Sequence, residues 1–124
     1  LIAVNDNASL AIEQMAREIR LGTNFTVPTP SQLNFINAFG QTVSYSLNGA
    51  SEALERKVNL DSFEPITGGN VKIKRLIFTL DGALAADNKQ PRITVRLSVG
   101  SASPRLEGFL TNLQTTLSAR ELDS

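Results

Sequence analysis

The sequence predicts an α+β fold, with an N-terminal amphipathic helix packed on an antiparallel β-sheet of about six strands. Three observations carry this prediction. Residues 1–22 have a helical repeat of apolar side chains, much of 32–118 alternates between apolar and polar residues, and turn-forming residues separate the alternating segments. At 124 residues the chain is long enough for one core. We therefore expect helix 1–22 and a β-rich head, 23–124, to form one domain.

The first 21 residues have the spacing of an amphipathic helix. Apolar residues recur at steps of three and four and so share one stripe, which comprises Leu1, Val4, Ala8, Ile12, Met15 and Ile19. The last three of these are expected in the core. Charged residues lie on the opposite side, and Glu13 precedes Arg17 by four residues, which favours an ion pair. Gly22 is expected to end the helix, because glycine tolerates a left-handed turn.

Segment 23–31 carries Pro28 and Pro30 and has no periodicity, which predicts an extended connector without regular structure. Strands are then predicted where apolar and polar residues alternate. The first includes Leu33, Phe35 and Phe39. The second, 42–47, ends at Asn48-Gly49, a strong hairpin signal because both residues tolerate positive φ.

Segment 51–58 is ambiguous. Its composition, rich in Glu, Ala, Leu and Arg, favours a short helix, whereas the preceding hairpin signal favours a third strand. We favour the strand, with Leu54, Arg56 and Val58 on one face. The next segment, 59–70, contains Pro65 and a Gly-Gly pair and is predicted to be a loop.

The remaining strands are predicted at 71–80, 93–99 and 113–117. In the first of these the apolar phase slips: Val71 and Ile73 share one face, and Leu76, Phe78 and Leu80 share the other. A one-residue slip moves every side chain across a sheet, so we predict a bulge near Lys74 and Arg75.

Composition excludes several chemistries. The chain has no Cys, His or Trp, which removes thiol and imidazole nucleophiles and the usual zinc ligands, and no cofactor is expected. Twelve basic residues balance twelve acidic ones. Because no basic stripe is present, nucleic acid is not a predicted partner. The trio Lys72, Lys74 and Arg75 is interpreted as a solvated strand edge rather than a grip for an acidic partner.

Other candidate sites are weak. Asp81, Asp87 and Asn88 share a predicted turn, but their spacing does not fit a calcium loop, so we expect a solvated turn. Two acidic pairs resemble the carboxylates of a glycosidase only in composition, and no catalytic pair is predicted from them: Glu52 with Glu55, and Asp61 with Glu64. Phe25 and Phe63 are expected to pin their loops to the core.

Taken together, a helix, a proline-bearing connector and an antiparallel sheet in this order resemble the soluble part of type IV pilins and type II secretion pseudopilins. Residues 12–20 (IEQMAREIR) look like the stretch where a pilin stem helix enters the head. Segments 71–80 and 90–97 resemble paired strands of the minor, J- or W-type subunits. Residues 113–122 (LQTTLSAREL) look like the end of that subgroup.

This resemblance implies a non-enzymatic subunit that assembles into, or primes, a type IV pilus-like or type II secretion filament. Its implied partners are other pilin or pseudopilin subunits, contacted through stem helix and head, and the bacterial inner membrane, reached by an apolar helix upstream of Leu1. The head would lie in the periplasm, outside the cell or in a surface filament. Leu1, Ile2 and Val4 are the expected assembly surface. The alternative is a free-standing extracytoplasmic β-rich binding or adhesion module.

Overall fold

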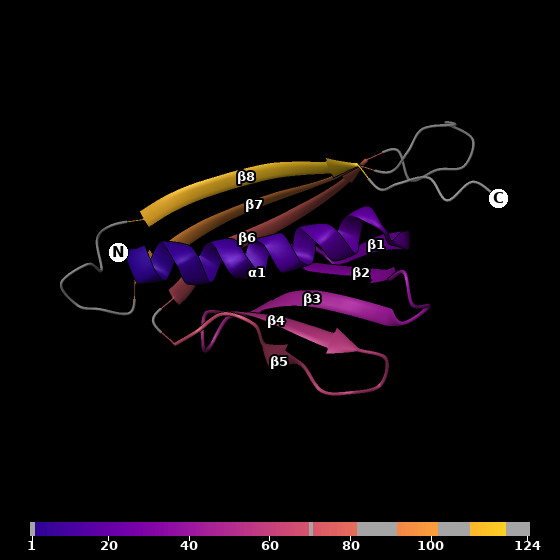
Figure 1. Ribbon diagram of the computed structural model, residues 1–124, viewed down its shortest axis with the longest axis horizontal. Coiled ribbons are helices and arrows are strands. Elements are labelled where there is room, and N and C mark those ends of the chain that lie inside the picture. Colours follow the sequence, from indigo (N-terminus) through magenta and orange to yellow (C-terminus); the bar gives the residue numbers. More distant parts are fainter. Residues whose placement is uncertain (1, 70, 82–91, 102–109, 119–124) are drawn as a thin grey trace.

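The computed structural model describes residues 2–69, 71–81, 92–101 and 110–118, although the side chains of 2–8, 101, 110 and 111 are outside this description. Within it the chain forms one helix and eight strands (Figure 1). The elements are α1 (Ile2–Arg20), β1 (Thr23–Thr29), β2 (Gln32–Ile36), β3 (Thr42–Asn48), β4 (Ala53–Val58), β5 (Glu64–Pro65), β6 (Val71–Asp81), β7 (Arg92–Ser101) and β8 (Leu110–Ser118).

The predicted fold class, a helix on one antiparallel sheet of about six strands, is wrong. The described residues are mostly β, and their eight strands form two antiparallel sheets. A five-stranded sheet has the order β1-β2-β3-β4-β5, and a three-stranded sheet has the order β6-β7-β8. Figure 1 shows α1 lying across both sheets.

The sheets meet where β1 approaches β6, and prolines explain why they do not merge. The Phe78 N–H donates to the Pro30 carbonyl oxygen at 2.7 Å, and the Ser31 hydroxyl donates to the Leu76 carbonyl oxygen at 2.9 Å. Proline has no backbone N–H, so a continuous ladder cannot form through Pro28 and Pro30. The junction therefore has isolated contacts where a single sheet would have a ladder.

The expected connector at 23–31 is largely strand β1, which corrects the prediction. It pairs with β2 at Thr23–Ile36, Thr26–Asn34 and Thr29–Gln32, and the register shifts between these pairs. Proline is compatible with extended backbone at the edge of a sheet, so the residues that predicted a connector are tolerated here. Phe25 is buried on β1, and its ring stacks on Phe35 with centroids 5.3 Å apart.

Helix α1 buries one stripe against the sheets. Ala11, Met15, Ala16 and Ile19 are buried, whereas Ile12, expected in the core, is only partly buried. Alanine at two of these positions allows close approach to the strands below. The predicted pair between Arg17 and Glu13 is present at 2.7 Å on the exposed side, where it contributes about 0.3 kcal/mol.

The strand predictions for 51–58, 71–80, 93–99 and 113–117 are confirmed, whereas the predicted loop at 59–70 contains the short strand β5, which forms because it pairs with β4. Segment 53–58 is strand β4, paired with β3, and not a helix. The predicted bulge in β6 lies between Ile73 and Arg75, where the register with β7 shifts. Beyond it the side chains of β6, β7 and β8 alternate regularly, with apolar residues such as Phe78, Val95 and Leu117 facing the core.

Gly49 and Gly22 lie at a hairpin and at the end of the helix, as predicted, but neither is there because it adopts a positive φ. The β3–β4 hairpin has a four-residue loop in which the Asn48 side-chain oxygen accepts from the Ala50 and Ser51 N–H groups, and positive φ (59°) occurs at Glu52. Gly22 does follow α1, but its φ is not positive. A Cβ there would lie 2.6 Å from Phe35 Cδ2. Gly22 is needed because α1 ends close against β2.

Candidate functional site

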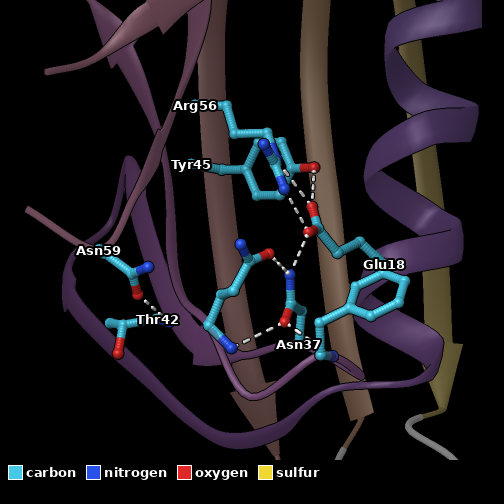
Figure 2. A network of polar contacts seen from close by, with 8 residues as sticks. Glu18, Asn37, Thr42, Tyr45, Arg56 and Asn59 are labelled. Carbon is cyan, nitrogen blue, oxygen red and sulfur yellow. Dashed lines mark hydrogen bonds and ion pairs between the residues drawn. The ribbon is translucent and has the colours of Figure 1, made fainter. Parts of the chain in front are cut away.

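A polar cluster joins α1 to the five-stranded sheet (Figure 2). Glu18 projects from α1 and meets Asn37, Tyr45 and Arg56, which come from the turn after β2, from β3 and from β4. Arg56 contacts Glu18 through two nitrogens, with Nε 2.9 Å from Oε1 and Nη2 2.5 Å from Oε2. The Tyr45 hydroxyl donates to Oε1 at 2.5 Å, and the Asn37 side-chain nitrogen donates to Oε2 at 3.0 Å. The carboxylate therefore accepts four hydrogen bonds from three residues.

Asn37 extends this cluster into the turn between β2 and β3. Its side-chain oxygen accepts from the backbone N–H groups of Phe39 and Gln41, and its side-chain nitrogen also donates to the Gln41 side chain at 2.9 Å. An asparagine that bonds nearby backbone groups in this way stabilises a turn locally. The turn carrying Phe39 is consequently fixed relative to α1.

The charges in the cluster stabilise one another. Burial alone would raise the pKa of Glu18, but hydrogen bonds from Arg56, Asn37 and Tyr45 outweigh it, so its pKa lies below the ordinary value. Burial and the neighbouring Glu18 carboxylate raise the pKa of Tyr45 far above its usual range. The hydrogen bond to Glu18 raises the pKa of Arg56. Glu18 is therefore ionised and Tyr45 neutral at physiological pH.

This arrangement suits a structural role better than catalysis. We call the cluster of Glu18, Asn37, Tyr45 and Arg56 the clamp, because it holds the helix on the sheet. A general base needs an accessible lone pair and a pKa near the working pH, whereas Glu18 is saturated with donors and has a lowered pKa. Tyr45 is fully buried and its hydroxyl is engaged by the carboxylate. The cluster positions α1 on β3 and β4.

Beside the clamp lies an open groove between α1 and the β2–β3 turn, which we call the helix groove. It encloses about 580 Å³ and is lined by Leu10, Glu13, Gln14, Arg17, Glu18, Leu21, Asn37, Ala38, Phe39 and Arg56. Three large apolar side chains border it with substantial exposure: Leu10 at 65%, Leu21 at 41% and Phe39 at 86%. Phe39 was predicted on a strand with Phe35, but β2 ends at Ile36, so Phe39 projects from the turn.

Of the predicted assembly residues, Ile2 and Val4 lie at the start of α1, and Leu1 lies outside the described residues. Ile2 and Val4 belong to the helical backbone of α1, but the three side chains lie outside the described part of the structure. The structure therefore leaves this prediction open.

The weak sequence candidates are not brought together as sites. Glu52 pairs with Lys74 at 2.9 Å, whereas Glu55 accepts from the Asn48 side chain. This pair with Lys74 ties β6 to the β3–β4 loop. Asp61 and Glu64 are both exposed. Among the described residues no group of three His, Cys, Asp or Glu side chains could hold a metal ion.

The remaining predicted residues have mixed outcomes. Phe25 is in the core, as predicted, although on a strand. Phe63 is half-buried, with the Lys57 ammonium 5.1 Å from its ring centroid. Asp81 ends β6, while Asp87 and Asn88 lie outside the described residues.

Sequence reasoning missed the clamp, although one signal was available. Arg56 was predicted to share a face with Leu54 and Val58, and a charged residue on an inward face requires a partner. The partner, Glu18, lies 38 positions away and on a helix. The pairing itself became visible only in the fold.

Comparisons of the chain with family models, curated proteins and solved structures find no match. None of the helical structure in the described residues is long and apolar enough to cross a bilayer. The helix groove and clamp must therefore be interpreted from their own geometry.

Proposed function

We propose that this chain is a non-enzymatic minor pilin or pseudopilin subunit that assembles into, or primes, a type IV pilus-like or type II secretion filament. The observation that carries the proposal is the helix groove, where Leu10 of α1, Leu21 just after α1 and Phe39 of the β2–β3 turn are exposed together. The location that follows is the inner membrane with the head outside the cytoplasm, or the filament itself.

The groove has the chemistry of a protein contact. Exposed aromatic and aliphatic side chains close together are uncommon on a surface that stays in water, and they are typical of the centre of an interface. The ion pair between Glu13 and Arg17 lies at the rim, where charges tune orientation more than affinity. A neighbouring subunit would cover the apolar residues and leave that pair at its margin.

The clamp supports the same function mechanically. In a filament, a helix shared between subunits must stay fixed to its own head. Here Glu18 anchors α1 to β3 and β4, while Met15 and Ile19 are fully buried beneath it. A contact made along α1 would thus be transmitted to the sheets. Repeated head-to-tail contacts of this kind generate open filaments.

The test is a pair of apolar-to-acid substitutions in the complete gene product, expressed in its own cells. Phe39→Asp places a charge in the groove and should reduce recovery of the subunit with sheared filaments about tenfold or more, since a buried unpaired charge is costly. Leu60→Asp is the matched control, because Leu60 is fully exposed (101%) outside the groove.

Both variants should retain the parental melting temperature. Equal recovery of the two variants would contradict an interface at the groove, and a parent protein found only free in the cytoplasm would contradict the proposed function altogether. Turnover of hydrolase substrates by the purified chain would contradict its non-enzymatic part.

A second candidate, a free-standing extracytoplasmic binding module, is favoured by the outer face of the three-stranded sheet. There Arg75 and Arg96 border a shallow recess of about 300 Å³, which is also lined by Leu97, Ser98, Asn112, Leu113 and Gln114. A recess with two arginines beside polar and apolar groups suits a sugar or a protein. Binding of acidic oligosaccharides that is lost on Arg96→Ala, by a parent chain that is not recovered with sheared filaments, would favour this candidate.

A further inference from the structure

The outer edge of β8 is the feature that the proposed function does not use. β8 is the last strand of the three-stranded sheet, and within the described residues no strand lies beside its outer edge. Its nine residues pair with β7 without any register shift. The edge is therefore long and regular, and edges of this kind offer backbone groups to another strand.

The other outer strands carry features that discourage pairing. β5 has only two residues, one of them Pro65. β1 contains Pro28, has two register shifts and lies against β6. β6 has a bulge and carries Lys72 and Lys74. Proline, bulges, short length and lysine are the usual means by which proteins protect an edge.

β8 has none of these features. Its sequence, LTNLQTTLS, contains no charged residue and no proline. Its threonines favour extended structure, and the absence of charge means that no repulsion opposes pairing with an identical strand. The contrast with β1, β5 and β6 indicates an edge that is kept open for a partner.

We propose that β8 pairs antiparallel with β8 of a second copy of this chain, joining two three-stranded sheets into one six-stranded sheet. An antiparallel pair of identical strands satisfies a two-fold axis without further adjustment. We identify the occupant as a second copy because β8 carries no charge, so two identical edges would meet without charge repulsion. This inference goes beyond the proposed function and does not depend on it.

The side-chain pattern selects a register centred on Thr115. In it Leu113 of each copy lies opposite Leu117 of the other, on the face that already packs on the core. Gln114 then lies opposite Thr116 on the exposed polar face. Directly opposed residues share a face in an antiparallel pair, so this register matches apolar with apolar and polar with polar.

The first experiment is analytical ultracentrifugation of the whole chain, comparing two threonine-to-lysine variants. Thr79 and Thr116 are both exposed and lie in the same cross-strand row, Thr79–Thr94–Thr116, but Thr79 is on β6 and Thr116 on the open edge. The parent and Thr79→Lys should form dimers. Thr116→Lys places lysines on both sides of the two-fold axis and should raise the dimer Kd about tenfold or more.

The second experiment tests the register. Because the chain has no cysteine, a single introduced cysteine can link only to its copy. Thr115→Cys lies on the proposed axis and should form a disulfide-linked dimer under mild oxidation. Asn112→Cys should not, because the two 112 positions would be about 20 Å apart, well beyond disulfide reach.

These results are decisive in either direction, even if Thr116→Lys fails to fold, because the cysteine variants leave the edge uncharged. A parent chain that stays monomeric at all concentrations means that something other than a second copy covers the edge, and it overturns the proposal. So does a dimer that Thr116→Lys, shown by its melting curve to be folded, leaves intact. Asn112→Cys cross-linking as readily as Thr115→Cys would overturn it as well.

Discussion

The two sheets are stabilised in different ways. The three-stranded sheet has long strands, one bulge and regular alternation, and its inner face is apolar. The five-stranded sheet has an interrupted β1 and a column of stacked rings, Phe25, Phe35 and Tyr45, that ends at the Glu18–Arg56 pair. The first sheet relies on apolar burial, which has no direction. The second adds directional polar contacts that fix where α1 lies.

Replacing a buried aromatic residue in either sheet should have the largest effect on the free energy of unfolding. Phe35→Ala in the five-stranded sheet and Phe78→Ala in the three-stranded sheet each remove a buried ring and should each lower the free energy of unfolding by about 3–5 kcal/mol. Phe35 also stacks on two rings, so its loss should exceed that of Phe78 by about 1 kcal/mol. Urea unfolding measures both. Equal losses would show that stacking adds nothing beyond burial.

Two arginines provide the next comparison. Arg56→Met leaves the Glu18 carboxylate in the clamp without its charged partner and should cost about 2–3 kcal/mol, less than a fully buried pair because Arg56 is 24% exposed. Arg96→Met removes one exposed hydrogen bond to Gln114 on the outer face and should cost less than about 0.5 kcal/mol. Thermal melts of the two variants measure this difference. Similar values would mean that the clamp contributes no more than a surface contact.

Replacing two glycines by alanine should give a smaller difference in the free energy of unfolding. Gly22→Ala brings a Cβ to 2.6 Å from the Phe35 ring, where α1 meets β2, and should cost about 1–2 kcal/mol through overpacking. Gly49→Ala, in the β3–β4 loop, meets nothing within 4 Å and should change stability by less than about 0.5 kcal/mol. A neutral Gly22→Ala would show that the ring moves aside freely.

The smallest expected effect is the dependence on pH of the stability that Glu18 contributes. The pKa of Glu18 is lower in the folded chain than its ordinary value of 4.5, so the unfolded chain binds more protons as the pH falls. The clamp therefore contributes fully above that value and loses its contribution as the pH falls through the folded pKa. Glu18→Gln should be less stable than the parent by about 1 kcal/mol at neutral pH, and the gap should close in acid. Melting curves recorded across this range check it, and a constant gap would contradict the assignment.

The sequence predicted the individual strands of the three-stranded sheet better than those of the five-stranded one. Alternation such as that of Ile93, Val95 and Leu97 marks a strand because one face is buried, and the phase slip near Lys74 located the bulge. β1 was missed because Pro28 within it, Pro30 just after it and its sparse apolar residues resemble a connector, and its strand character comes from hydrogen bonds to β2. β5 is held by pairing with β4 rather than by its own pattern.

The division into two sheets and the clamp were beyond sequence reasoning for one shared reason. Both depend on which distant residues meet: Pro30 with Phe78, and Glu18 with Arg56. Local patterns predict the face of an element but not the identity of its neighbour. The exposed position of Phe39 likewise depends on where β2 ends. The alternation of apolar residues predicted a strand that reaches Phe39, but β2 ends at Ile36.

The ring at the end of the aromatic column also has a practical consequence. The chain contains a single tyrosine and no tryptophan, so its intrinsic fluorescence is dominated by Tyr45. That ring lies at the joint between helix and strand and donates its hydroxyl to Glu18. Release of the helix would end this contact and transfer the ring to water, so the emission of the unlabelled protein reports whether the joint is intact.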